Sequence, residues 1–218
     1  VAQRDQAAAE HVAGAAANAD AAAAQDLERE QRPREHVAQL VREEAEALAE
    51  AVEQVDAQMS PWQPESALNQ LNRAPVGDWL ALPAQILEVL ARALEVCRLS
   101  DGAFDPAVGA LVDAWGFGAA CDTPDAEAIR AARNAKRLPT PQALELDLAA
   151  GLARKHSPLQ LDLCGIAKGY AVDVAGQTLA ELGCEHYMVE VGGETIVKGQ
   201  RPGGGKWRIG IQTPDELS

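Results

Sequence analysis

One short segment carries the clearest structural pattern in the chain: Leu159-Gln160-Leu161-Asp162-Leu163-Cys164-Gly165-Ile166-Ala167-Lys168-Gly169-Tyr170. Apolar residues alternate with polar ones at its start, which is typical of a strand, and the periodicity of a helix begins near Ile166. We therefore expect a strand, a tight turn at Gly165 and a helix that carries Lys168 in its first turn.

A strand, a glycine and a helix in this order can bind phosphate. The N–H groups of the first helical turn lack partners within the helix, and the helix dipole is positive there. Lys168 would add a full positive charge, and Asp162 could hold a cation or a sugar hydroxyl. The same order also serves packing alone in α/β proteins. Asp162 is then a helix cap and Lys168 a solvated lysine.

The composition narrows the possible functions. The chain has 218 residues, 47% of them hydrophobic, and a formal net charge of −14. This charge and an aromatic content of 4% disfavour nucleic-acid binding, which needs clustered basic side chains or stacking rings. No apolar stretch approaches the roughly 18 residues of a membrane span. The four cysteines, at positions 97, 121, 164 and 184, follow no zinc-binding spacing.

The N-terminal part of the chain differs from the rest. Residues 1–33 are rich in alanine and poor in large apolar side chains, so we expect a frayed helix or a disordered tail. Residues 34–218 form one domain in this interpretation. It opens with an amphipathic helix that ends before Pro61 and has one apolar face: Val37, Leu40, Val41, Leu48, Val52, Val55 and Met59.

Further elements follow from capping and turn residues. The expected helices begin at Ser66, at about Pro83, at Asp105-Pro106, at Thr123-Pro124 and at Ile166. Residues 135–158 are expected to be loop with short extended pieces. The expected strands are His186–Val191, Glu194–Lys198 and Trp207–Ile211, with a hairpin turn at Gly192-Gly193.

Four segments stand in a specific order along residues 45–213. They are Met59-Ser60-Pro61-Trp62-Gln63-Pro64-Glu65-Ser66, then Ser100-Asp101-Gly102-Ala103-Phe104-Asp105-Pro106, then residues 161–170, then Val189-Glu190-Val191-Gly192-Gly193-Glu194 with Trp207-Arg208-Ile209-Gly210-Ile211. Together they resemble the FAD:protein FMN transferases, the ApbE family, formerly described as thiamine-biosynthesis lipoproteins.

The resemblance implies a fold and an activity. The fold would be α+β, an ApbE-like flavin transferase fold that lacks its C-terminal part. The enzyme would use Mg²⁺ to transfer FMN from FAD to a threonine of a partner flavoprotein and release AMP. The partner would be a subunit of a bacterial electron-transport complex, in the periplasm or at the outer face of the inner membrane.

The resemblance also implies roles for individual residues, although it assigns no catalytic residue. Asp162 would contact FAD, Lys168 would hold a flavin-nucleotide phosphate, and the carbonyl of Gly165 would be a Mg²⁺ ligand. Trp62 would pack on the flavin. Ala103, Phe104 and Asp105 would form a second contact strip.

Structural interpretations stand beside these roles. Trp62 could belong to the core, Asp105 could cap the helix that starts at Pro106, and Glu190 and Glu194 flank a turn.

Some positions depart from the family pattern. Cys164 stands where glycine is usual, and it would narrow the turn or place a reactive thiol near the ligand. Pro61 replaces a threonine, and residues 1–32 contain no match to the family's opening strand. The remaining metal ligands, an Asp and a hydroxyl residue, would lie beyond Ser218. A non-catalytic FAD-binding carrier and an FAD pyrophosphatase are therefore the alternative functions.

Overall fold

The computed structural model describes residues 39–118 and 123–210. The chain divides into two compact units, residues 1–47 and residues 48–218. Residues 39–59 are helical, which confirms the predicted amphipathic helix within the described range. The predicted tail of residues 1–33 lies outside that range.

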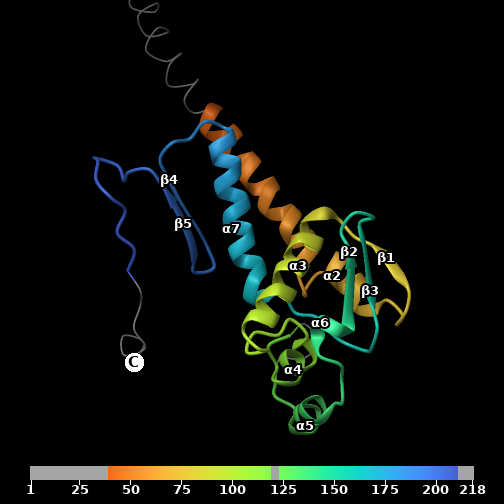
Figure 1. Cartoon of the computed structure of the whole chain (residues 1–218). Helices are drawn as coiled ribbons and strands as arrows, with labels where there is room; N and C mark the ends of the chain where they lie inside the picture. The colour runs from red at the N-terminus through yellow and green to blue at the C-terminus, as the bar shows by residue number, and fades with distance from the viewer. Residues whose placement is uncertain (1–38, 119–122, 211–218) are drawn as a thin grey trace, which may run out of the picture. The chain divides into compact units, whose positions relative to one another are not determined.

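The second unit combines helices with two small antiparallel sheets, as the α+β prediction requires (Figure 1). One sheet has the strand order β1-β3-β2 and the other is the hairpin β4-β5. The labelled elements are α2 (Ala67–Arg73), β1 (Trp79–Ala81), α3 (Ala84–Leu99), α4 (Gly109–Ala114), α5 (Ala126–Asn134), α6 (Thr140–Ala143), β2 (Leu144–Asp147), β3 (Leu152–Lys155), α7 (Cys164–Glu181), β4 (Tyr187–Val191) and β5 (Glu194–Lys198).

Helix α3 supplies much of the core. Ile86, Leu90 and Ala93 recur on one face of this helix and are completely buried. Each fully buried leucine or isoleucine contributes roughly 1.5–3 kcal/mol through removal of apolar surface from water. Helix α7 joins this core through Ala171, and the hydroxyl of Tyr170 donates to Glu88 on α3 at 3.2 Å. The core therefore fixes the start of α7.

The three-stranded sheet was only partly expected from the sequence. Its middle row pairs Leu80 with Ala153 and Ala153 with Leu146, and Ala153 is completely buried. The strands have only three or four residues, so their alternation is too short to be recognised. The short extended pieces expected within residues 135–158 are confirmed as β2 and β3, whereas α6 and β1 were not predicted.

The hairpin β4–β5 confirms the expected two strands and their glycine turn. Gly192 and Gly193 have φ values of 58° and 94°, the left-handed conformation that such a tight turn requires. The Gly193 N–H donates to Glu190 Oε1 at 2.7 Å, so Glu190 stabilises the turn. The third predicted strand does not form over residues 207–210, and residue 211 lies outside the described range. There the Trp207 indole N–H donates to the Lys198 carbonyl at 3.0 Å.

Two predicted helix starts were displaced. Helix α4 begins at Gly109 and not at Asp105-Pro106, although the Asp105 carboxylate accepts from the Ala107 N–H as a cap would. Helix α5 is capped by Asp125, whose carboxylate accepts from the N–H groups of Glu127 and Ala128, and not by Thr123.

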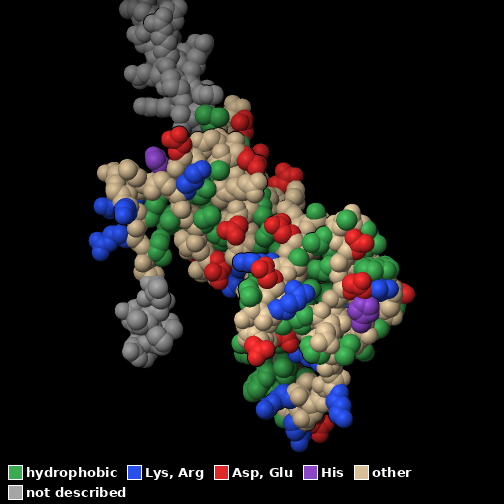
Figure 2. All heavy atoms as spheres, viewed as in Figure 1, with side chains coloured by type: hydrophobic (Ala, Val, Ile, Leu, Met, Phe, Trp, Pro, Cys, Tyr) green, Lys and Arg blue, Asp and Glu red, His purple; other side chains and the backbone are tan. Residues whose placement is uncertain are grey.

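The surface is consistent with the acidic composition of the chain. On the face drawn in Figure 2, acidic side chains are scattered among apolar and uncharged ones. Among residues 39–118 and 123–210, no helix has the length and apolar character needed to cross a membrane.

Candidate functional site

Two adjoining pockets of the second unit share Pro61 and Trp62. The first pocket has a volume of about 220 Å³ and includes Cys164 and Lys168 of α7. The second has a volume of about 300 Å³ and includes Asp162. We call these two pockets the cleft. The structure therefore brings three predicted site residues, Trp62, Asp162 and Lys168, to one region.

The indole of Trp62 is available to a ligand. The residue is 62% exposed, so the interpretation of Trp62 as a core residue was wrong. It lies in the loop between helix 39–59 and α2, where its N–H donates to Ser60 Oγ at 3.3 Å. An exposed indole at a pocket offers a flat apolar face on which an aromatic ring can stack.

Residues 160–162 reach the cleft without forming the predicted strand. The Asp162 N–H donates to the Pro106 carbonyl at 2.8 Å, and the Gly109 N–H donates to the Gln160 carbonyl at 3.0 Å. On the other side, both backbone groups of Leu161 bond to the Asn72 side chain. The backbone of this segment is thus satisfied by a loop and a side chain instead of a neighbouring strand.

The start of α7 offers fewer free amides than a phosphate cradle was expected to offer. The Cys164 N–H donates to Asp162 Oδ1 at 2.8 Å, and the amides of Ile166 and Ala167 both bond to the Leu163 carbonyl. Of the amides from 164 to 167, only that of Gly165 has no partner among the described residues. Gly165 lies inside the helix, so the predicted turn at this residue was wrong.

Lys168 extends from the first turns of α7 toward the hairpin turn. Its Nζ donates to the Gly192 carbonyl at 3.4 Å, a long hydrogen bond of an exposed side chain. This weak contact leaves the ammonium group free to turn toward an anion in the 220 Å³ pocket.

The thiol of Cys164 is not activated. Desolvation of the sulfur and the neighbouring Asp162 carboxylate raise the pKa of Cys164 to about 11. The thiolate is the nucleophilic form, and at neutral pH this cysteine is protonated. The expectation of a reactive thiol was therefore wrong.

The three residues of the second predicted contact strip, residues 103–105, lie in different surroundings. A β-carbon built on Gly165 would lie 3.4 Å from Phe104 Cε2, so Phe104 lies beside the start of α7. Ala103 is exposed and lines neither pocket of the cleft. None of these three residues lines either pocket of the cleft, and Phe104 is the one seen beside Gly165.

Asp105 is engaged in a local network. Its carboxylate accepts hydrogen bonds from Arg137 at 2.6 Å, from Thr140 at 2.6 Å and from the Ala107 N–H at 2.9 Å. Burial raises the pKa of Asp105, but these bonds and the Arg137 charge outweigh burial and lower it overall. These hydrogen bonds fix the 103–107 loop, so the role of Asp105 in the structure is to hold this loop in place.

The described residues do not make a magnesium site. Mg²⁺ requires six oxygen ligands in nearly octahedral geometry. The Gly165 carbonyl would provide one ligand, and the described part of the chain contains no group of three or more His, Cys, Asp or Glu residues that could hold a metal ion.

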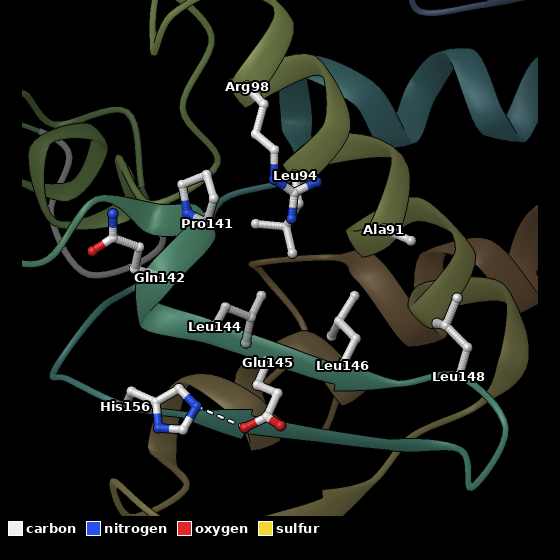
Figure 3. Close-up of a pocket in the computed structure, with 10 residues that line it drawn as sticks. All are labelled: Ala91, Leu94, Arg98, Pro141, Gln142, Leu144, Glu145, Leu146, Leu148 and His156. Atoms are coloured by element: carbon white, nitrogen blue, oxygen red, sulfur yellow. Dashed lines mark hydrogen bonds and ion pairs between the residues drawn. The ribbon is translucent and has the colours of Figure 1, made fainter.

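A further pocket of about 390 Å³ lies between α3, α6 and β2 (Figure 3). Its acidic residue, Glu145, bonds to His156 at 2.7 Å and to Arg154 at 2.6 Å. These partners lower the pKa of Glu145 and occupy its carboxylate. The sequence assigned no role to His156, and the structure places its Nε2 in hydrogen-bond contact with Glu145 Oε2. The cleft remains the better candidate site.

Comparisons with known proteins identify the family of the chain. Residues 19–218 match the model of the ApbE family. The chain is 38% identical over 165 residues to the FAD:protein FMN transferase of Vibrio cholerae, an alignment that covers 75% of this chain and 48% of that protein. It is 31% identical over 188 residues to the protein of the same name from Haemophilus influenzae, with 79% and 50% covered.

Solved structures give the same result. The flavin transferase ApbE from Vibrio cholerae superposes with a TM-score of 0.72 at 34% identity, over 79% of this chain and 56% of that one. The ApbE protein from Thermotoga maritima gives a TM-score of 0.69 at 29% identity, with 79% and 56% covered. The chain spans about half the length of the curated relatives it matches.

Proposed function

Because the chain belongs to the ApbE family, we propose that its cleft binds FAD and serves the transfer of FMN to a protein acceptor. The proposal rests on one observation: two adjoining pockets are lined by Trp62, Asp162 and Lys168. An exposed ring, a carboxylate and an ammonium suit the three chemical parts of FAD, namely its flavin, its sugar hydroxyls and its diphosphate.

The proposed reaction is a phosphoryl transfer to a threonine. The threonine oxygen attacks the FMN phosphorus, the bond to the AMP phosphate oxygen breaks, and the threonine proton is released. Negative charge accumulates on the departing AMP phosphate, so fixed positive groups beside it lower the barrier. Lys168 and Arg73 are the cationic side chains among the described residues that line the cleft, and the free Gly165 amide lies at the start of α7.

The remaining roles are proposals drawn from the family resemblance. Asp162 contacts FAD, Trp62 stacks on the flavin, and Ala103, Phe104 and Asp105 form a second contact strip. The Mg²⁺ requirement, with the Gly165 carbonyl as a ligand, also rests on the resemblance, since the described residues supply no complete donor set. The proposed acceptor is a flavoprotein subunit of a bacterial electron-transport complex, in the periplasm or at the outer face of the inner membrane.

Substitution of Lys168 by methionine tests the proposal. Methionine keeps an unbranched chain but removes the charge, so we expect the Kd for FAD to rise about tenfold, the loss of a modest charged contact. Lys136→Met, at an exposed lysine that lines neither pocket, is the control. Equilibrium dialysis with FAD measures the effect. An unchanged Kd for Lys168→Met would contradict the assignment of the phosphate to this residue.

The products of the reaction separate transfer from the alternatives. The protein is incubated with FAD, Mg²⁺ and an acceptor that bears a competent threonine. Covalent FMN on the acceptor, seen by mass spectrometry, supports transfer, whereas free FMN and AMP indicate a pyrophosphatase. Bound but unaltered FAD would favour a carrier, the function that the missing metal donors among the described residues favour.

A further inference from the structure

We infer that Asn69 and Asn72 of α2 are positioning residues that set the two walls of the cleft separately. Asn69 holds the loop of Trp62, and Asn72 holds the segment of Asp162. The inference rests on the proposed function, because it assigns the flavin to the first wall and the sugar hydroxyls of the nucleotide to the second.

Helix α2 is a rigid support for both side chains. Leu68 and Leu71 are buried to 0% and 1% exposure, and they anchor the helix in the core. Ser66, which is equally buried, caps its start by accepting from the Asn69 N–H at 3.2 Å. Asn69 and Asn72 are three residues apart, a spacing that places both on one face of a helix. Both line the 300 Å³ pocket.

Asn69 braces the Trp62 loop from both sides. Its Nδ2 donates to the Pro61 carbonyl at 2.9 Å and to the Gln63 carbonyl at 2.9 Å. These carbonyls directly precede and follow Trp62. Since the indole is exposed, the tryptophan is not held by its own burial. The Asn69 amide therefore fixes the backbone from which the ring projects.

Asn72 makes a corresponding pair of bonds to the other wall. Its Nδ2 donates to the Leu161 carbonyl at 3.0 Å, and its Oδ1 accepts from the Leu161 N–H at 2.8 Å. One side chain thus satisfies both backbone groups of the residue that precedes Asp162. The opposite side of this segment is held by Pro106 and Gly109, so its position has little freedom.

A buried lysine secures the backbone of Asn72. Lys155 is only 4% exposed, and its Nζ donates to the Asn72 carbonyl at 2.6 Å. A positive charge at the C-terminal end of a helix is favourable, because the exposed carbonyls there are negative. Lys155 thereby fixes the end of α2 on β3 and, through it, the wall that carries Asp162.

Two separately braced walls predict separable effects on binding. Riboflavin contains the flavin ring without phosphate, and ADP contains a ribose with free hydroxyls and the diphosphate without the flavin. Asn69→Ala is expected to raise the Kd for riboflavin about tenfold while the Kd for ADP changes less than about twofold. Asn72→Ala is expected to show the opposite preference. Bound riboflavin should also be less quenched in Asn69→Ala, because the indole no longer stacks in a fixed position.

The control lies on the same helix. The Gln70 side chain also donates to a backbone carbonyl, that of Glu65 at 2.9 Å, but Gln70 does not line the cleft. Gln70→Ala should leave both dissociation constants unchanged. Asn69→Asp and Asn72→Asp keep the side-chain size and lose the donated bonds, so they replace the alanine variants if those do not fold.

The outcomes distinguish this inference from the proposed function. If the wild-type protein binds FAD and its fragments but the asparagine variants weaken riboflavin and ADP equally, or not at all, the inference fails and the proposed function stands. If the near-isosteric aspartate variants also fail to fold, the inference is overturned, because the two asparagines would then serve only the stability of the fold. If the wild-type protein binds no flavin or diphosphate, both fail.

Discussion

At Asp105, the same hydrogen bonds that fix a loop also tie stability to pH. Burial favours the neutral carboxyl, but the bonds from Thr140, Ala107 and Arg137 favour the carboxylate and lower its pKa. A carboxyl whose pKa is lower in the folded state stabilises the protein above its unfolded pKa. That contribution disappears as the pH falls through the folded pKa.

We therefore predict a pH-dependent effect of Asp105→Asn. At pH 7 the variant should lose about 1.5–3 kcal/mol of unfolding free energy, the range for charge-assisted hydrogen bonds. The deficit relative to wild type should shrink as the pH falls below the unfolded pKa, near 3.8. Urea unfolding followed by circular dichroism between pH 7 and pH 3 measures it. A deficit that stays constant over this range would show that the charge is not what stabilises the loop.

The sequence predicted which site residues lie close together, but it did not predict which residues surround each of them. Trp62, Asp162 and Lys168 do meet at the cleft. The sequence did not reveal that Arg137 and Thr140, more than 30 residues away, occupy Asp105. The role of Asn72 could not be predicted either, since it depends on Leu161, which is 89 positions away in the sequence.

At the scale of elements, the contact between α7 and the hairpin β4–β5 depends on a glycine. A β-carbon at Gly176 would lie 3.0 Å from Ile196 Cδ1 and 3.3 Å from Ile196 Cγ2. On the same helix, a β-carbon at Gly169 would meet no atom within 4 Å. Only the first position therefore requires the absence of a side chain.

Alanine substitutions at these two glycines should change the unfolding free energy by amounts that differ in sign or size. Gly169→Ala should stabilise the protein by about 0.5–1 kcal/mol through helix propensity. Gly176→Ala should fall short of that gain by about 1 kcal/mol or more, because Ile196 must shift. Combining it with Ile196→Val, which removes Cδ1, should recover part of the difference. Thermal and urea unfolding measure these changes in stability. Equal effects of the two alanine substitutions would contradict the prediction, because Ile196 would then shift at no cost.

Element length explains which parts of the fold could be predicted. Helix α3 has 16 residues, so its apolar periodicity repeats enough to be recognised, and the glycine turn identifies the hairpin. The short strands of the first sheet carry no comparable signal. Residues 159–163 alternate like a strand, but they are held by a loop and by Asn72. Local pattern cannot reveal such long-range partners.

At the scale of the whole molecule, the second unit contains its own core. The buried residues of helix 39–59, Val55 and Met59, belong to residues 48–218. Removal of residues 1–47 should therefore change the melting temperature by less than about 2 °C, below the shift that 1 kcal/mol produces in a domain of this size. Differential scanning calorimetry of the shortened and the full chain tests this. A larger drop would show that the first unit contributes to the core.

The bonds between Asn72 and Leu161 also constrain when the cleft can form during synthesis. The two residues are 89 positions apart, so α2 leaves the ribosome long before its partner exists. Nascent chains leave the ribosome at roughly 5–20 residues per second, so the Asn72 side-chain amide is hydrogen-bonded to water for several seconds before Leu161 is synthesised. A nascent chain would therefore complete the wall that carries Asp162 only after Leu161 has left the ribosome.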